Sequence, residues 1–113
     1  MKKTYYHATK KENVLKIIHK DGLKADFMGL VYLSDTVEGA LEFMKARKDP
    51  GIYAVIPVYV DEEKIAESFD HNPEYIKANA FTHAGSIPVS NIERDLSNIP
   101  LFKLSMKKKR NEG

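Results

Sequence analysis

The order of apolar and polar positions predicts a strand followed by a helix at the start of the chain. Lys3–Ala8 is rich in Tyr and Thr, which favour strands, and His7 closes this apolar stretch. Three apolar residues then recur at the spacing of one helix face: Val14, Ile17 and Ile18. Thr9 and Glu12 fit a capping box at the start of this helix, and Gly22 is a typical residue to end it.

The rest of the chain has the pattern of further strands and two more helices. Residues that favour strands predict four of them: Leu30–Ser34, Ile52–Val60, Tyr75–His83 and Leu101–Ser105. A helix over Val37–Arg47 follows a capping Asp35 or Thr36, and a short helix is predicted over Glu62–Ser68. Pro57 cannot donate a backbone hydrogen bond, so it favours an edge position or a bulge in its strand.

Helices early in the chain and strands later predict an α+β domain with a split, mostly antiparallel sheet and two to three short helices. We expect residues 1–105 to form this domain, because 113 residues suffice for one core but not for two. Residues 106–113 are a basic tail that we expect to be disordered, with its positive charge on Lys107, Lys108, Lys109 and Arg110. Such a tail can contact nucleic acid weakly and without sequence choice.

Composition places the chain among ordinary soluble globular proteins, with 42% apolar and 30% charged residues. Because the chain has no Cys, it has no disulfide, no Cys-based zinc site and no thiol nucleophile. No apolar run is long enough to cross a bilayer, and no signal-peptide pattern opens the chain. We therefore expect a cytoplasmic protein without membrane contact.

The common catalytic and metal-binding motifs are missing from the sequence. The four histidines fit no zinc spacing, and a metal site without Cys would need several carboxylates, so no metal site is predicted. The six glycines form neither a phosphate-binding loop nor a nucleophile elbow. Three arginines stand against fifteen lysines, which leaves few side chains for bidentate phosphate contacts.

Two strands carry the candidate chemistry. His7 ends an apolar strand, where it is either a structural residue or a hydrogen-bond donor to a ligand hydroxyl. His19 and His71 lie in polar surroundings that are typical of the protein surface. By alternation, Tyr32 and Ser34 share one face of the second strand. In a cleft, these two side chains would offer a flat stacking surface with a hydroxyl beside it.

Three short motifs between residues 4 and 92 together resemble the ADP-ribosyltransferase superfamily. They are Tyr6-His7-Ala8-Thr9 on the first strand, Gly-Leu-Val-Tyr-Leu-Ser-Asp over Gly29–Asp35, and Ile87–Ile92, which is similar to the family's Ile-Pro-Pro-x-x-Ile ending. The similar branch holds the poly-ADP-ribose polymerases, the DNA-modifying toxins and the RNA 2′-phosphotransferases. The resemblance implies a split-sheet clamp that grips NAD and consumes it as a substrate.

The resemblance also implies roles for individual residues. In that family the His hydrogen-bonds a ribose hydroxyl, the backbone after it holds the nicotinamide carboxamide, and the Tyr stacks on the nicotinamide ring. The matching positions here are His7, then Ala8 with Thr9, and Tyr32, although the family has Gly where this chain has Ala8. The polymerases carry a second aromatic residue at the position of Phe43 and an amide-contacting Ser at the position of Ala40.

The family further uses a carboxylate a few residues before the Ile-Pro turn, where it stabilises the oxocarbenium-like ribose and activates the acceptor. Residues 77–83 contain no acid in this chain. Asn79 is the best candidate in register, and we expect it to replace the acid as a neutral hydrogen-bonding group. Glu74 is the nearest acid upstream, and it would need a register shift to serve.

The resemblance therefore predicts three functions, in decreasing order of preference. The first is a mono-ADP-ribosyltransferase, a glycosyltransferase that moves ADP-ribose from NAD to a protein or nucleic acid and releases nicotinamide. The second is a binding module for NAD or ADP-ribose that has lost catalysis together with the carboxylate. The third is an NAD-dependent RNA 2′-phosphotransferase, a class that relies on several arginines. The size of the chain resembles the minimal domains of small toxins.

Overall fold

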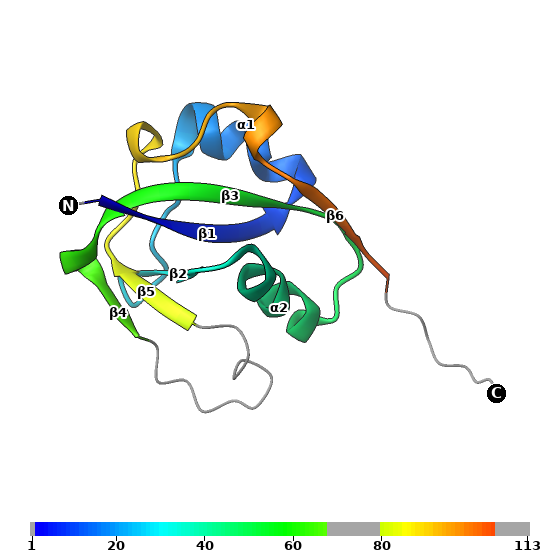
Figure 1. Cartoon of the computed structure of the whole chain (residues 1–113), viewed down its shortest axis with the longest axis horizontal. Helices are drawn as coiled ribbons and strands as arrows, with labels where there is room; N and C mark the ends of the chain where they lie inside the picture. Colours follow the sequence, from blue (N-terminus) through cyan, green and yellow to red (C-terminus); the bar gives the residue numbers. More distant parts are fainter. Residues whose placement is uncertain (1, 68–79, 106–113) are drawn as a thin grey trace.

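The computed structural model describes residues 2–67 and 80–105, and within these ranges the chain forms one antiparallel sheet with two α-helices (Figure 1). The strands are, in chain order, β1 (Lys2–Lys10), β2 (Leu30–Ser34), β3 (Gly51–Asp61), β4 (Ile65–Glu67), β5 (Ala80–Ala84) and β6 (Leu101–Leu104). They lie in the order β4-β5-β2-β1-β3-β6, and every neighbouring pair is antiparallel. The predicted α+β class with an antiparallel sheet is confirmed.

The sheet consists of two three-stranded halves that meet at a single residue pair. All nine residues of β1 pair with β3. β1 and β2, in contrast, are in register only at Tyr6 and Ser34. The halves β4-β5-β2 and β1-β3-β6 therefore separate on either side of this pair.

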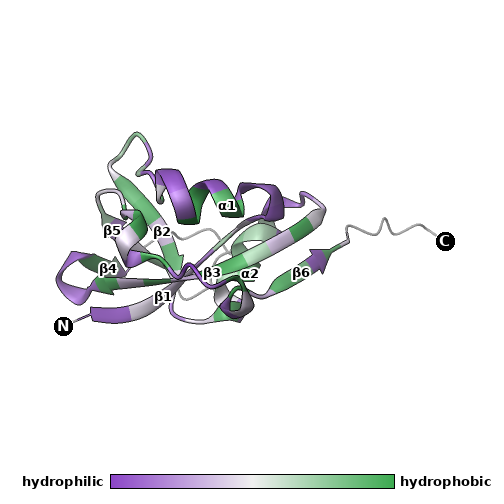
Figure 2. Cartoon of the chain, turned by 90° about the horizontal axis from the view of Figure 1, so that it is seen from above, coloured by the Kyte–Doolittle hydropathy of each residue, from purple (hydrophilic) through white to green (hydrophobic). Residues whose placement is uncertain are grey.

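The two helices cover opposite faces of the sheet (Figure 1). α1 (Val14–Lys16) is the central turn of a helical segment over residues 11–21, which begins with a 3-10 turn and ends with a wider π turn. Figure 2 shows hydrophilic and hydrophobic bands along this segment. Val14, Ile17 and Ile18 pack in one core, as the predicted apolar face requires. α2 (Val37–Arg47) begins at Thr36, whose Oγ1 accepts a hydrogen bond of 2.9 Å from the Gly39 amide.

Alternate residues of β3 point to the two faces of the sheet and supply two cores. Ile56 and Val58 belong to the larger core, together with residues of the first helical segment such as Ile18. Tyr53 and Val55 belong to the smaller core, which they share with three small or apolar residues of β1 and α2: Ala8, Ala40 and Leu41. β1 and β3 are thus fixed by packing on both faces.

The first helical segment starts later than the sequence predicts. Thr9 lies inside β1, which continues to Lys10, so the predicted capping box of Thr9 and Glu12 is wrong. Pairing of β1 with β3 holds the Thr9 backbone extended and overrides the local helix signal. Thr9 Oγ1 instead accepts a hydrogen bond of 3.3 Å from Asn13 Nδ2. Gly22 ends the segment with a φ of 69°, as predicted.

Most of the later elements are confirmed to within one residue: β2, α2, β3 and β6. The helix predicted over Glu62–Ser68 is wrong, because a single 3-10 turn over Glu62–Lys64 leads into strand β4. β4 pairs with β5, and this pairing satisfies backbone groups that a short helix leaves open. The strand predicted over Tyr75–His83 is confirmed from Ala80 onward, while residues 75–79 lie outside the described residues.

Pro57 lies in an internal strand at a position that resembles an edge. β6 pairs with β3 only over Gly51–Ala54, so at Pro57 the side of β3 away from β1 has no strand partner. On that side the Pro57 carbonyl accepts a hydrogen bond of 3.0 Å from the Glu93 amide. The missing N–H of Pro57 therefore interrupts no strand pairing.

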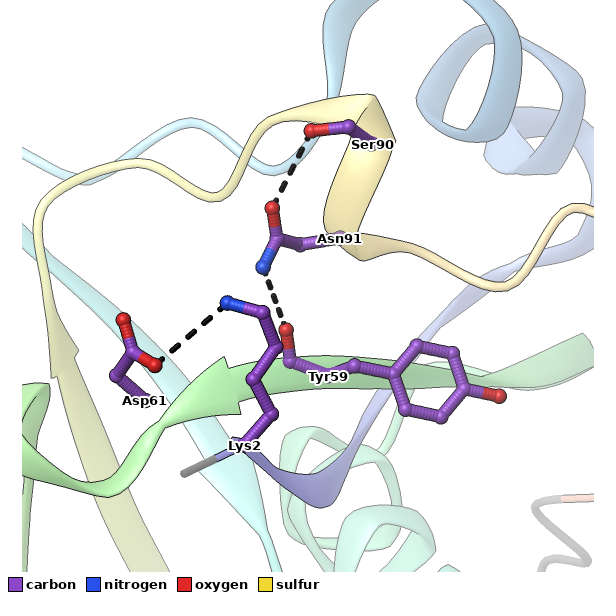
Figure 3. A network of polar contacts seen from close by, with 5 residues as sticks. All are labelled: Lys2, Tyr59, Asp61, Ser90 and Asn91. Carbon is purple, nitrogen blue, oxygen red and sulfur yellow. Dashed lines mark hydrogen bonds and ion pairs between the residues drawn. The ribbon is translucent and has the colours of Figure 1, made fainter.

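Polar contacts hold the turn after β5 against β3 (Figure 3). Ser90 Oγ donates to Asn91 Oδ1 at 3.2 Å, and Asn91 Nδ2 donates to the Tyr59 carbonyl at 2.6 Å. Near the same end of β3, Lys2 Nζ lies 3.5 Å from Asp61 Oδ1 across the β1–β3 pair. These contacts join the turn after β5 and the start of β1 to β3, in the half-sheet that contains β1.

Candidate functional site

A cavity of about 620 Å³ opens where the two halves of the sheet separate. Its walls come mainly from β1, β2 and α2. Five of the residues predicted from the sequence line it: His7, Ala8, Thr9, Tyr32 and Phe43. The fold therefore brings together motifs from three elements that are far apart along the chain.

The opening results from an interruption of the strand pairing. Tyr6 pairs with Ser34, and the same antiparallel register would place Ala8 opposite Tyr32. Both strands are described in full, and this second pair does not form. The side chain of His7 reaches the second strand instead, and its Nδ1 lies 3.2 Å from the Tyr32 carbonyl oxygen.

The backbone of Ala8 faces this opening. Its partner on β3 is Val55, whose N–H donates at 3.1 Å to the Pro100 carbonyl on the far side of β3. The N–H and C=O of one strand residue point to the same side, so the Ala8–Val55 pair exchanges no hydrogen bond and the Ala8 groups point toward β2. There they have no strand partner, and together they can bind a ligand that carries an acceptor beside a donor, such as a primary carboxamide.

His7 is held as one neutral tautomer. A carbonyl oxygen only accepts hydrogen bonds, so Nδ1 carries the proton and donates to Tyr32. Burial lowers the pKa of His7 below its usual 6.5, the hydrogen bond to Tyr32 opposes this shift, and the positive charge of Arg47 adds to it. The imidazole is therefore neutral near pH 7, and its Nε2 can accept a hydrogen bond but has no proton to donate.

α2 and β2 supply the aromatic surface of the cavity. One face of α2 lines it with four residues at helical spacing: Ala40, Phe43, Met44 and Arg47. Val31 and Leu33 of β2 are buried in the core beneath α1, so Tyr32 between them points to the α2 side of the sheet. Tyr32 is 39% exposed, which leaves its ring accessible to a ligand.

The end of the cavity next to the last residues of β1 and α2 is charged. Lys10 and Arg47 bring positive charge to the wall and Asp49 brings negative charge. Lys10 Nζ lies 2.9 Å from Asp49 Oδ2, and this hydrogen bond raises the pKa of Lys10. The Tyr53 hydroxyl donates to the Asp49 carbonyl at 2.6 Å and fixes the turn that carries this carboxylate.

Asp26 is a second acid of the cavity wall, and its side chain is engaged by the turn before β2. Its Oδ1 accepts hydrogen bonds from the amides of Met28 at 2.9 Å and Leu30 at 3.1 Å. Within the described lining, Asp26 and Asp49 thus both have structural partners. Neither is placed as a free general base.

Several predicted features lie outside the cavity or outside the described residues. Ser34 is fully buried beside the Tyr6 pair, does not line the cavity and accepts a hydrogen bond of 3.3 Å from the Thr36 amide. Asn79, His71 and the tail residues 106–113 lie outside the described residues. In the described ranges no three His, Asp or Glu side chains gather as a metal site would require, and no helix there is long and apolar enough to cross a membrane.

The sequence motifs do not single out the charged end of the cavity. Arg47 follows Phe43 by one helical turn, so placing Phe43 in the site would also predict that Arg47 lines it. The Lys10–Asp49 ion pair has no comparable signal, because it depends on how the turn after α2 meets the end of β1.

No family model, no curated protein and no solved structure matches this chain, so the function has to be argued from the geometry of the site and the chemistry of its residues.

Proposed function

We propose that this protein binds NAD in the cavity between the sheet halves and acts as a mono-ADP-ribosyltransferase on a macromolecular acceptor. The observation that carries the proposal is the meeting of His7, Tyr32 and Phe43 at the opening that the Ala8 backbone faces. A cavity of about 620 Å³ also falls within the range of small-molecule sites, which is about 300–1,000 Å³.

Each of these groups has a matching partner on NAD. The nicotinamide ring would lie between Tyr32 and Phe43, where aromatic contacts contribute about 0.5–1.5 kcal/mol each beyond the area they bury. Its carboxamide carries an acceptor beside a donor, which match the N–H and C=O of Ala8. His7 Nε2 would accept a hydrogen bond from a ribose hydroxyl and so fix the orientation of the sugar.

The proposed transfer breaks the bond between the nicotinamide nitrogen and C1′ of the ribose. The electron pair of that bond leaves with nicotinamide, which departs as a neutral molecule, while the acceptor bonds to C1′ and loses its proton to solvent. His7, Ala8 and Tyr32 would orient the two sides of the breaking bond as the oxocarbenium-like sugar forms. We further propose, on the sequence register alone, that the neutral side-chain amide of Asn79 forms a hydrogen bond to the acceptor.

A binding module without turnover is the second candidate, and one observation favours it. Asp26 and Asp49, the acids of the described lining, are engaged by the turn before β2 and by Lys10. An RNA 2′-phosphotransferase is less well supported, because it would need several arginines on the RNA phosphate. In the described lining Arg47 is the single arginine.

Nicotinamide release and NAD affinity, measured on the same preparation, test this proposal. We expect chromatography to show nicotinamide accumulating from NAD, and calorimetry to show that His7→Ala and Tyr32→Ala each weaken NAD binding at least about tenfold. His19→Ala is the matched control, because His19 is exposed and does not line the cavity. Binding without release would favour the second candidate. Normal NAD binding by both His7→Ala and Tyr32→Ala would show that the cavity is not the NAD site.

A further inference from the structure

We propose that Arg47 is an anion-binding residue of this cavity and holds the diphosphate of the bound dinucleotide, while the Lys10–Asp49 ion pair sets the charge beside it. This inference rests on the proposed function, because the diphosphate is the part of NAD that joins its two nucleosides. None of the sequence motifs includes Arg47, and its place in the fold carries the inference.

The lining residues of α2 and of β1 follow one another in the same direction, from an aromatic end at Tyr32 and Phe43 to the charged end at Arg47 and Lys10. On α2, Arg47 follows Phe43 by one turn, about 6 Å along the helix axis. On β1, Lys10 follows His7 by three residues, about 10 Å along the strand. The ion pair of 2.9 Å between Lys10 and Asp49 joins the far ends of both walls, because Asp49 comes directly after α2 and its cap. A ligand with its nicotinamide at the aromatic end therefore extends its ribose and then its phosphates toward Arg47.

The charge of Arg47 is not neutralised within the described part of the chain. The described carboxylates form ion pairs with five lysines and with no arginine. The guanidinium is close enough to His7 to lower the pKa of that imidazole, which places its charge near the same space. An uncompensated guanidinium on a cavity wall offers a fixed charge and a fork of donors that match phosphate oxygens.

The Lys10–Asp49 ion pair controls how much positive charge the diphosphate meets. With Asp49 in place, the positive charge of Lys10 is offset by the carboxylate, and Arg47 is the cation at this end without a described carboxylate partner. Lys24, a further lining cation without a described ion pair, comes from the segment before β2. Replacing Asp49 by Asn would free Lys10 and remove an anion from the same wall. We therefore expect Asp49→Asn to strengthen diphosphate binding, whereas a purely structural ion pair would weaken the site when broken.

Calorimetric titrations with NAD and with nicotinamide riboside separate the diphosphate from the rest of the ligand, because the riboside has the same base and sugar but no phosphate. We expect Arg47→Gln to weaken NAD binding about 10–100-fold and to change riboside binding less than about twofold. Arg47→Lys keeps the positive charge but loses the forked donor geometry of the guanidinium. We therefore expect its NAD affinity to lie between those of the wild-type protein and Arg47→Gln. Asp49→Asn should tighten NAD binding about 3–10-fold at low salt, with the gain falling as salt rises.

Arg94→Gln is the matched control, because both arginines are exposed but Arg94 does not line the cavity. We expect this variant to bind both ligands as the wild-type protein does. Equal NAD affinity of the wild-type protein and Arg47→Gln would overturn the role of Arg47 and leave the proposed NAD site intact. A parallel loss of both ligands in Arg47→Gln would also overturn it, because Arg47 would then support the cavity as a whole. A wild-type protein that binds neither ligand would refute the proposed function and this inference together.

Discussion

Gly22 ends the first helical segment and lies against the turn after β5. We expect Gly22→Ala to destabilise the fold by about 2–4 kcal/mol. Its φ of 69° and ψ of −163° lie in a region that is nearly restricted to glycine, where strain costs about 1–3 kcal/mol. A Cβ at Gly22 would also overlap the Ile87 carbonyl oxygen. That oxygen accepts a hydrogen bond of 2.9 Å from the Leu23 amide, and the Ile87 amide donates back at 2.8 Å. Relieving the overlap would disturb this pair, worth about 1 kcal/mol for each bond.

Gly29→Ala is the matched control for this prediction. Gly29 has a φ of 78°, but no atom lies within 4 Å of a Cβ built there, so its substitution adds backbone strain without overlap. We expect a cost of about 1–2 kcal/mol for Gly29→Ala. For a domain of this size 1 kcal/mol lowers Tm by about 4 °C, so thermal unfolding should show losses of about 8–16 °C for Gly22→Ala and about half as much for the control. A loss in Gly22→Ala no larger than that in Gly29→Ala would refute the steric part of the reasoning.

Three other predictions concern His7, Tyr59 and the cap of α2. Because burial lowers the pKa of His7 in the folded state, the unfolded chain takes up this proton first below about pH 6.5, and stability falls as the pH falls. Urea titrations should show a larger loss between pH 7 and 5 for the wild-type protein than for His7→Gln, and equal losses would contradict the assignment. Tyr59 OH donates to Glu93 Oε1 at 2.5 Å, which raises the pKa of Tyr59 to about 12. An ultraviolet difference titration against Tyr59→Phe should show this late ionisation, and Glu93→Gln should move it to lower pH. Thr36→Ala should cost about 1 kcal/mol in thermal unfolding, whereas Thr36→Ser, which keeps the capping oxygen, should cost much less.

Local residue patterns predict four elements of this fold to within one residue: β2, α2, β3 and β6. The sequence predicts β2 and α2 with their observed bounds, because β-favouring residues and a capping Thr36 are local signals. The errors occur where strand pairing decides the conformation. Thr9 carries a capping signal but pairs with Ala54 of β3, and residues 65–67 follow an acidic helix start but pair with β5. Such pairing depends on residues far away in the sequence.

The same limit applies to the site. Short motifs predict His7 and Tyr32, the resemblance drawn from those motifs adds Phe43, and all three line one cavity. Ser34 shares the face of Tyr32 as alternation requires, yet its pair with Tyr6 closes the sheet at that point and buries it. Alternation predicts which face a side chain takes, and it does not predict where two strands separate.

The place where the strands separate also explains how Ala8, a residue with a side chain, presents main-chain groups to the opening. The Ala8 methyl group packs in the smaller core beneath α2, and the residue is 6% exposed. The proposed contact to a carboxamide uses only the N–H and C=O of Ala8, which the missing pair with Tyr32 leaves without a strand partner. Buried backbone groups without partners cost free energy, and a ligand that carries both a donor and an acceptor would satisfy them together. The interruption that opens the cavity therefore also leaves the main-chain atoms that we propose to bind the carboxamide, and a side-chain motif does not reveal such atoms.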